Sequence, residues 1–205
     1  EGEAAIVDPL RDIQPYLDRI DKEGVQLKYI FETHFHADFV SGHIDLAKKT
    51  GATIVYGPTT MSTGFEKKVG QDGEVFTVGG STITLIHTPG QNMESSCYLL
   101  KDEQGKERGI ITGDTLFIGD VGRPDLAQKA ASMTQEQLAA TLFNSLRKKI
   151  MTLPDDVIVY PAHGAGSACG KNLSKETIGS LGEQKKTNYA LRHDMTEAEF
   201  ITEVT

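Results

Sequence analysis

The chain has 205 residues and a mass of 22.3 kDa, enough for one domain that needs neither a disulfide nor a metal merely to fold. Its 29 acidic side chains outnumber the 21 basic ones and give a net charge of −8, which argues against nucleic acid as a partner. No apolar run approaches the roughly 20 residues of a membrane span, and the two cysteines form no CxxC motif, so we expect a disulfide-free cytoplasmic protein without membrane contact.

Strands and helices alternate over the first part of the chain. Asp12 is placed to cap a helix that ends at Gly24, and a second helix over Ile44–Lys49 ends at Gly51. Short runs rich in β-branched residues predict the strands around these helices. The first three predicted strands are Ala4–Val7, Leu27–Phe31 and Thr53–Tyr56.

The middle of the chain is typical of antiparallel β-structure. Gly79 and Gly80 separate two alternating runs by two residues, which indicates a hairpin, and the charged loop from Lys101 to Glu107 joins the next two runs. Cys97 lies in the third run and is expected to be core. The four predicted strands are Glu74–Val78, Thr82–His87, Cys97–Leu100 and Gly109–Thr112.

The last part of the chain returns to helices. A Thr134-x-x-Gln137 capping box begins a long helix, and a Thr196-x-x-Glu199 box begins a final one, with a strand over Val157–Tyr160 between them. The long helix carries an apolar stripe expected to be core: Leu138, Leu142, Leu146 and Ile150. Helices at both ends of a β-rich middle predict an α/β (α+β) protein, a four-layer αββα sandwich.

The strongest chemical signal follows the second predicted strand. His34, His36 and Asp38 alternate along an extended segment, so their side chains can converge on one point. Imidazole and carboxylate together suit zinc or iron rather than magnesium or calcium.

Three more potential ligands end later strands. His87, Asp114 and His163 are each followed within a few residues by glycine, so each can project from one sheet edge into a shared pocket. The other two histidines, His43 and His193, are interpreted as local helix-end or surface residues.

This order of HxHxD, His, Asp and His at strand ends resembles the metallo-β-lactamase superfamily over nearly the whole chain, and the resemblance implies a metal where the two sheets of the αββα sandwich meet. The segment 119–125 (GDVGRPD), with the loops Phe35–Gly42 and Pro161–Lys171, is similar to the persulfide-dioxygenase branch. It is most similar to the dioxygenase domain of proteins fused to a rhodanese sulfurtransferase. Phe39 stands where dinuclear hydrolases of the superfamily have a second histidine, so we expect a single metal.

The resemblance implies one Fe(II) per chain, held by His34, His87 and Asp114. Such a two-histidine, one-carboxylate triad leaves open positions for other ligands. The implied reaction is oxidation of a low-molecular-weight thiol persulfide, such as glutathione persulfide, by O2 to sulfite and thiol, in sulfide detoxification. The choice of His34 over His36 as the metal ligand comes from the resemblance.

The same resemblance gives His36, Asp38 and His163 roles in orienting ligands or handling protons. Many superfamily members read Thr-Pro-Gly-His where this chain has Gly90 followed by Gln91. This departure puts proton handling at position 91 in question.

Three residues are candidates for substrate binding. Cys169, in a glycine-rich rim loop, could exchange sulfane sulfur if Lys171 lowers the pKa of its thiol, and a spectator thiol is the alternative. Arg123 and Lys171 could meet a carboxylate of the thiol carrier, and a structural ion pair is the alternative for Arg123.

Two other functions remain open from the sequence. One is a metal-dependent thioester hydrolase of the glyoxalase II type, against which Phe39 argues. The other is a sulfur-binding module partnered with a rhodanese sulfurtransferase. We interpret residues 1–205 as one metallo-β-lactamase-like domain, trimmed at its N-terminus and cut from a longer chain with a C-terminal rhodanese domain.

Overall fold

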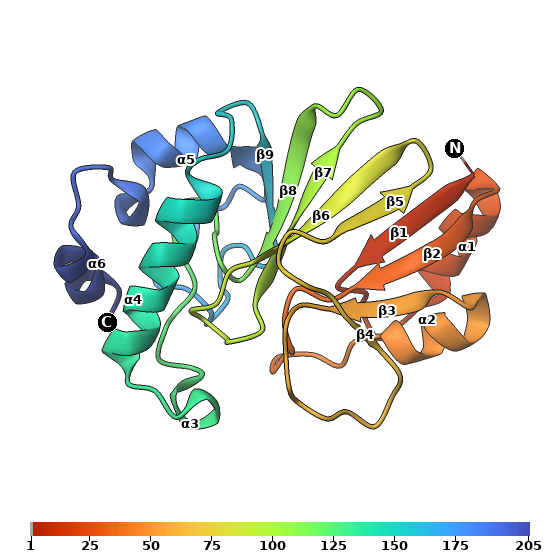
Figure 1. Cartoon of the computed structure of the whole chain (residues 1–205), viewed down its shortest axis with the longest axis horizontal. Coiled ribbons are helices and arrows are strands. Elements are labelled where there is room, and N and C mark those ends of the chain that lie inside the picture. The colour runs from red at the N-terminus through yellow and green to blue at the C-terminus, as the bar shows by residue number, and fades with distance from the viewer. Residues whose placement is uncertain (1) are drawn as a thin grey trace.

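Two β-sheets lie face to face in the computed structural model, which describes residues 2–205 (Figure 1). The first sheet has four parallel strands in the order β1-β2-β3-β4. They are β1 (Glu3–Val7), β2 (Gln26–Phe31), β3 (Thr53–Tyr56) and β4 (Lys68–Val69). The three strands predicted in this half are confirmed, with ends shifted by at most one residue.

The second sheet has six strands in the order β10-β9-β8-β7-β6-β5. The pairs from β5 to β8 are antiparallel, as the Gly79-Gly80 hairpin signal predicts, whereas β8 and β9 are parallel. The strands are β5 (Val75–Val78), β6 (Ser81–His87), β7 (Ser96–Lys101), β8 (Glu107–Gly113), β9 (Ile158–Pro161) and β10 (Gly179–Ser180).

Helices form the two outer layers (Figure 1). The first sheet is covered by α1 (Gln14–Glu23) and α2 (His43–Thr50), and the second by α4 (Gln135–Ser145) with its π-helical extension η1 (Leu146–Ile150), α5 (Leu181–Thr187) and α6 (Glu197–Val204). Short helices lie at α3 (Gln128–Ala131) and η2 (Tyr189–Leu191). Both predicted capping boxes are present, at Thr134 and Thr196. Among the described residues no helix has the length and apolar character to cross a membrane.

Three separate apolar layers of side chains lie between the two sheets and the two outer layers of helices. One lies between α1, α2 and the first sheet and includes Ile30 and Leu46. A second lies between the sheets and includes Phe31 and Tyr98, whose ring centroids are 4.7 Å apart. The third lies under α4 and α6 and contains Cys97 and three residues of the predicted stripe; Leu138, the fourth, is buried as well, so all are buried as expected. Each sheet therefore buries both faces, which confirms the αββα sandwich.

Two local expectations need correction. The helix α1 begins at Gln14 with Ile13 at the cap position, and Asp12 instead accepts a hydrogen bond from the Gln14 backbone N–H at 3.2 Å. The sequence reading also lacked the two-residue strands β4 and β10 and the helices α3 and α5. Strands of two residues carry no alternation, and α5 spans two turns, so neither leaves a clear periodic pattern.

The carboxyl ends of several strands meet at one edge of the sandwich. Strands β1, β2 and β3 run parallel in one sheet, and β6, β8 and β9 run in a common direction in the other. Gly113 ends β8 with a φ of 51°, and a Cβ atom there would lie 2.6 Å from the Thr33 side chain. Glycine is thus required where β8 approaches the segment after β2, and this close approach brings the two sheets' polar ends together.

Candidate metal centre

Asp114, the residue after β8, is at the centre of the polar cluster, with its carboxylate fully buried. Its Oδ1 accepts a hydrogen bond from His163 Nδ1 at 2.6 Å, and its Oδ2 lies 3.1 Å from Gln91 Nε2 and 3.4 Å from His34 Nε2. Burial alone would raise the pKa of Asp114, but the hydrogen bond from His163, with a further contribution from the neighbouring His34, holds that pKa well below its usual value. The ionised carboxylate therefore has a different set of neighbours on each oxygen.

His34 is oriented by the residue before it. The Thr33 hydroxyl donates to Asp8 Oδ2 at 2.7 Å and lies 2.8 Å from His34 Nδ1. Because the hydroxyl has one proton and gives it to Asp8, it accepts from His34 Nδ1–H. The Nε2 atom, which carries the lone pair, then faces the Asp114 carboxylate, an arrangement that calls for a cation between the two groups.

His36 is held by two carboxylates. Its Nε2 lies 3.0 Å from Asp8 Oδ1 and 3.1 Å from Glu32 Oε2. Burial lowers the pKa of His36, but the two carboxylates outweigh it and raise the pKa to about 10. Between ring centroids, His36 lies 4.2 Å from His34 and 4.4 Å from Phe39. Phe39 thus contacts His36 by packing and provides no metal donor.

Glu32 connects this part of the site to α2. Its carboxylate, fully buried, also accepts a hydrogen bond from His43 Nδ1 at 2.7 Å and one from the Ser41 hydroxyl. His43 does begin a helix, as interpreted from sequence, but it is buried and part of this network rather than a surface residue. Asp8 and Glu32 were missed by sequence reasoning, although both directly follow parallel strands whose carboxyl ends meet at one edge.

His163 lies between two carboxylates. Its Nδ1 contacts Asp114, and its Nε2 lies 2.7 Å from Asp38 Oδ2. The hydrogen bond to Asp114 is the main reason why the pKa of His163 rises to about 9, with Asp38 adding to it against the effect of burial. The Asp38 side chain is 44% exposed, so this pair leads from the buried carboxylate to solvent.

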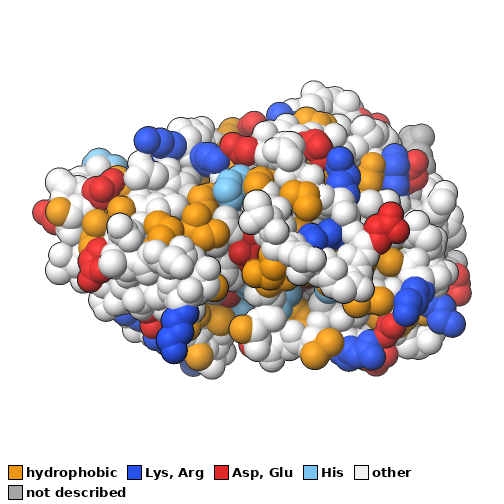
Figure 2. Space-filling view, turned by 60° about the horizontal axis from the view of Figure 1, so that its bottom comes forward, with side chains coloured by type: hydrophobic (Ala, Val, Ile, Leu, Met, Phe, Trp, Pro, Cys, Tyr) orange, Lys and Arg blue, Asp and Glu red, His pale blue; other side chains and the backbone are white. Residues whose placement is uncertain are grey.

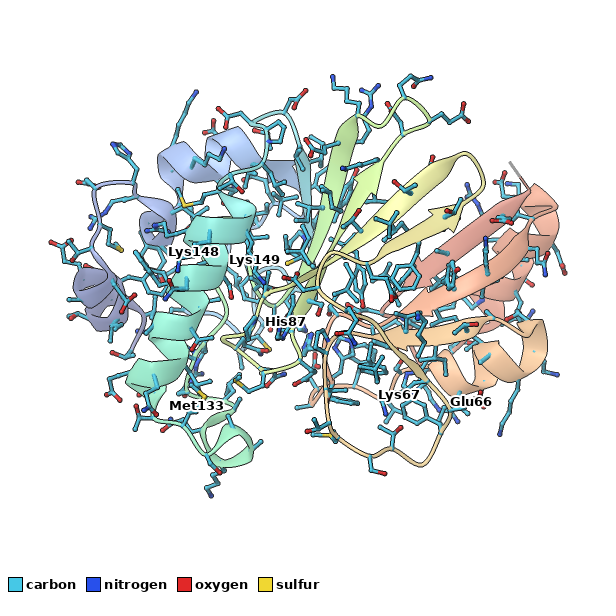
Figure 3. The ribbon with its side chains drawn as sticks, viewed as in Figure 1. Glu66, Lys67, His87, Met133, Lys148 and Lys149 are labelled. Carbon is cyan, nitrogen blue, oxygen red and sulfur yellow. The ribbon has the colours of Figure 1, made fainter. Side chains whose placement is uncertain are left out.

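His87 is not brought to this cluster. Its Nε2 lies 2.7 Å from the Met93 carbonyl oxygen, and its own carbonyl accepts from Lys149 of η1, which lies beside it (Figure 3). It lines a separate groove of about 710 Å³ with Met61 and Met93. The reason is the strand order: β7 lies between β6 and β8, so the ends of β6 and β8 are roughly 10 Å apart.

Gln91 takes the place beside Asp114 that His87 was expected to take. The loop after β6 returns across the start of β7 and places the buried Gln91 amide on Asp114 Oδ2. Sequence reasoning noted Gln91 as a departure from the superfamily pattern and did not assign it this contact.

Three buried side-chain atoms in residues 2–205 lack a hydrogen-bond partner: His36 Nδ1, Glu74 Oε2 and Gln91 Oε1. Two of the three belong to side chains that contact His34 or Asp114. A buried polar atom without a partner is costly, and a divalent cation at Asp114 would provide a partner for the Gln91 oxygen. Imidazole, carboxylate and amide donors suit zinc or iron, so these residues fit a bound metal.

The rim loop, residues 164–172, carries two of the predicted substrate residues. The pKa of the Cys169 thiol is raised to about 11, chiefly by burial and further by Asp114, so the expectation that Lys171 lowers it is wrong. The Lys171 ammonium instead reaches the Glu203 carbonyl oxygen at 3.3 Å. Cys169 itself does lie at the site, because its sulfur and the ligand atoms of Asp114 and His163 are within 4.8 Å of one another.

The Arg123 side chain forms hydrogen bonds with other residues of the chain. Its guanidinium forms two hydrogen bonds with the Asp125 carboxylate, at 3.0 and 2.6 Å, and a third with the Ala168 carbonyl oxygen at 3.2 Å. This geometry matches the structural ion pair that the sequence left open as the alternative. Through its bond to Ala168, Arg123 therefore connects the rim loop to the segment after β8.

Asp120 is the main anchor of the rim loop. Its fully buried carboxylate accepts the backbone N–H groups of Lys171 and Asn172, each at 2.6 Å, and the Tyr189 hydroxyl at 2.8 Å. We expect Asp120→Asn to lower the free energy of unfolding by about 1 to 3 kcal/mol, because the amide NH2 faces donors that then lack an acceptor. Urea unfolding measures this, and trypsin should cleave after Lys171 faster than in the wild type.

The matched control for this variant is Asp156→Asn, on an exposed carboxylate paired with Lys106. It should change neither measurement. Equal unfolding curves and cleavage rates for the two variants would mean that Asp120 does not hold the loop.

One face of the molecule is mixed in character. In the space-filling view, histidine side chains reach the surface in the middle of the molecule, among hydrophobic and acidic side chains (Figure 2). The site itself reaches solvent through His163 and Asp38, whose side chains are 15% and 44% exposed.

Comparison with known proteins agrees with this geometry. The profile of the Metallo-beta-lactamase superfamily matches residues 1–163, so the chain belongs to this superfamily. A metallo-β-lactamase from Staphylococcus aureus subsp. aureus COL is 36% identical, with a TM-score of 0.88, over 99% of this chain and 60% of that chain. The chain thus spans about three fifths of that protein.

A second solved structure points to a branch of the superfamily. ETHE1 from Myxococcus xanthus, a persulfide dioxygenase, is 27% identical, with a TM-score of 0.79, over 98% of this chain and 78% of that chain. The BLEG-1 B3 metallo-β-lactamase, 20% identical with a TM-score of 0.69 over 93% of this chain and 90% of that chain, shares the fold. The likeness to ETHE1 supports the persulfide-dioxygenase branch.

Proposed function

We propose that this protein is a mononuclear non-haem Fe(II) persulfide dioxygenase. Its substrates would be a low-molecular-weight thiol persulfide, such as glutathione persulfide, and O2. The observation that carries the proposal is the approach of His34 Nε2 to Asp114 Oδ2, with the buried Gln91 amide on the same oxygen and its own Oε1 unpartnered, while Phe39 supplies no donor. Likeness to ETHE1 supports the choice of reaction.

The residues that would hold the iron are His34, Asp114 and Gln91, with the His36 ring beside that of His34. Gln91 replaces His87 in this ligand set, because the amide and not the imidazole contacts Asp114. An Fe(II) ion bound there would supply positions for persulfide sulfur and dioxygen and carry electrons between them.

The overall reaction sets the task of the other residues. One persulfide, one O2 and one water give one thiol, one sulfite and two protons; the sulfane sulfur is oxidised by four electrons and O2 is reduced. The two protons must leave a buried site. His163 and Asp38 form a hydrogen-bonded path from Asp114 to solvent, and His36 exchanges protons with the carboxylates of Asp8 and Glu32.

The test combines metal analysis with product analysis. Protein purified without oxygen should contain one iron per chain and form sulfite from glutathione persulfide only when O2 is added. Sulfite formation without O2, or its absence from iron-loaded protein with O2, would reject the proposal. Thioester cleavage under anaerobic conditions would instead assign the glyoxalase II type of hydrolase.

Gln91→His is expected to bind iron more tightly than the wild type. A neutral imidazole is a better ligand than an amide oxygen for iron, and position 91 already lies on Asp114. The dissociation constant for Fe(II), measured by competition with a chelator, should fall by about 10-fold or more. His87→Gln is the matched control, because His87 lies in a separate groove, and it should leave the constant unchanged. A larger loss of affinity in the control than the gain in Gln91→His would restore His87 to the ligand set.

A further inference from the structure

The groove beside His87 is large enough for a small organic ligand. Its volume of about 710 Å³ falls within the roughly 300 to 1,000 Å³ of small-molecule sites, and His87 marks its position in Figure 3. Among the residues that the structure describes, those proposed to hold the iron do not line it. The groove is therefore a candidate position for the part of a substrate that does not react.

The groove adjoins the proposed iron position. Glu94, one of its lining residues, follows three positions after Gln91, whose amide contacts Asp114. The Glu94 carboxylate also accepts a hydrogen bond at 2.9 Å from the backbone N–H of Phe35, the residue between the two histidines of the HxHxD segment. A ligand whose sulfur lies at Asp114 would therefore have the groove next to its remaining atoms.

The walls of the groove are mainly apolar. Two methionines line it, and Met61 is 52% exposed and Met93 40% exposed. Methionine side chains are flexible and polarisable, so they adapt to apolar and sulfur-containing groups of different shapes. The other apolar lining residues are Pro58, Val69, Ala127, Ala130 and Ala131. These walls favour an apolar organic group over a polar one.

The groove lacks basic side chains. In the part of the chain that the structure describes, no lysine or arginine lines it. Two lysines near it are bound to other groups, because Lys67 donates to the Met61 carbonyl oxygen at 3.2 Å and Lys149 pairs with Asp72 at 2.9 Å. A carboxylate brought into this groove would lose its water without gaining a cationic partner, which is costly.

The rim of the site does not supply these cations either. The Arg123 guanidinium is bound to the Asp125 carboxylate, and the Lys171 ammonium reaches the Glu203 carbonyl oxygen. Glutathione carries a carboxylate at each end, and each of these groups needs a donor when it leaves water. The groove and the rim therefore discriminate against carriers of this kind.

We propose that the groove binds the organic part of an uncharged, largely apolar thiol persulfide, which the protein oxidises in preference to glutathione persulfide. This inference rests on the proposed dioxygenase function and narrows its substrate class. Met61 and Met93 determine the specificity, because they contact the apolar group while the terminal sulfur lies at Asp114. The overall reaction keeps the same balance of persulfide, O2 and water.

Methionine methyl groups report on binding without any reaction. Protein labelled with 13C at these methyl groups is titrated with methyl 2-phenylethyl sulfide, which has no S–S bond to oxidise. The signals of Met61 and Met93, assigned through Met61→Leu and Met93→Leu, should shift. Those of Met133, Met151 and Met195, which do not line the groove, should not. S-methylglutathione should require a concentration about 10-fold higher or more for the same shift.

Kinetics test the same preference. Iron-loaded protein should oxidise 2-phenylethyl persulfide with a kcat/KM about 10-fold or more above that for glutathione persulfide. Met93→Lys places an ammonium group in the groove and should lower this ratio by about 10-fold. The matched control is Ile178→Lys, because Ile178 is 53% exposed beside β10, at the edge of the second sheet far from β6. It should leave the ratio unchanged.

The two readouts separate this inference from the proposed function. Equal affinities for the two sulfides, or no shift of Met61 and Met93, would overturn the inference. An equal kcat/KM for the two persulfides would do the same, and O2-dependent sulfite formation would then leave the dioxygenase standing. If neither persulfide gave sulfite, the dioxygenase would be rejected, and the methyl shifts would still decide whether the groove prefers apolar groups.

Discussion

Asp114→Asn is expected to eliminate metal binding and sulfite formation. The substitution keeps the shape of the side chain but removes its charge, and its NH2 group would face either His163 Nδ1 or His34 Nε2. Losing a residue that only hydrogen-bonds to a metal ligand already costs about 10- to 100-fold in metal affinity or activity. Losing the charge of Asp114, which is proposed to bind the metal itself, should therefore cost about 100-fold or more. Iron content per chain and the O2-dependent rate measure the effect.

Asp156→Asn again serves as the control, since that exposed carboxylate should contribute little. Circular dichroism should show that Asp114→Asn retains the fold, because the three apolar layers do not include this side chain. A variant that kept wild-type iron content and rate would show that the metal centre lies elsewhere.

Glu32→Gln is expected to produce the largest loss of stability among polar substitutions at this edge. The buried carboxylate accepts hydrogen bonds from His36, His43 and Ser41, and its own hydrogen-bonding partners hold its pKa at about 2 despite burial. A neutral amide would leave charged or donor groups buried without their acceptor. Breaking such a network costs about 3 to 5 kcal/mol, which urea unfolding at neutral pH would show.

Glu66→Gln is the matched control, because Glu66 is exposed and forms no ion pair among the described contacts. Its free energy of unfolding should stay within about 0.5 kcal/mol of the wild type. If Glu32→Gln fell in that range as well, Glu32 would not be the link between His36 and α2.

The fold was predictable where local patterns are strong. The capping boxes at Thr134 and Thr196 mark helix starts correctly because they satisfy backbone N–H groups within one turn. The Gly79-Gly80 pair likewise indicates a hairpin that forms as expected. The two-residue strands β4 and β10 were not predictable, because they exist only through pairing with β3 and β9.

The residues of the site were likewise predictable only in part. The HxHxD segment and Asp114 were found from sequence because ligand-type residues follow buried strands, and the structure brings His34, Asp114 and His163 together. His87 was expected beside Asp114 but does not lie there, because of the order of the strands in the second sheet. Sequence places both His87 and Asp114 at strand ends, but it does not show that β7 separates them.

The sequence by itself determined the superfamily, the four layers and most of the potential ligands, since each depends on residues close together along the chain. Only the tertiary structure decided that Gln91 contacts Asp114, that Asp8 and Glu32 hold His36, and that the Cys169 sulfur lies near Asp114 and His163. These contacts join segments from different strands and loops. Their distances are set by strand order and by loop anchors such as Asp120, which no local pattern encodes.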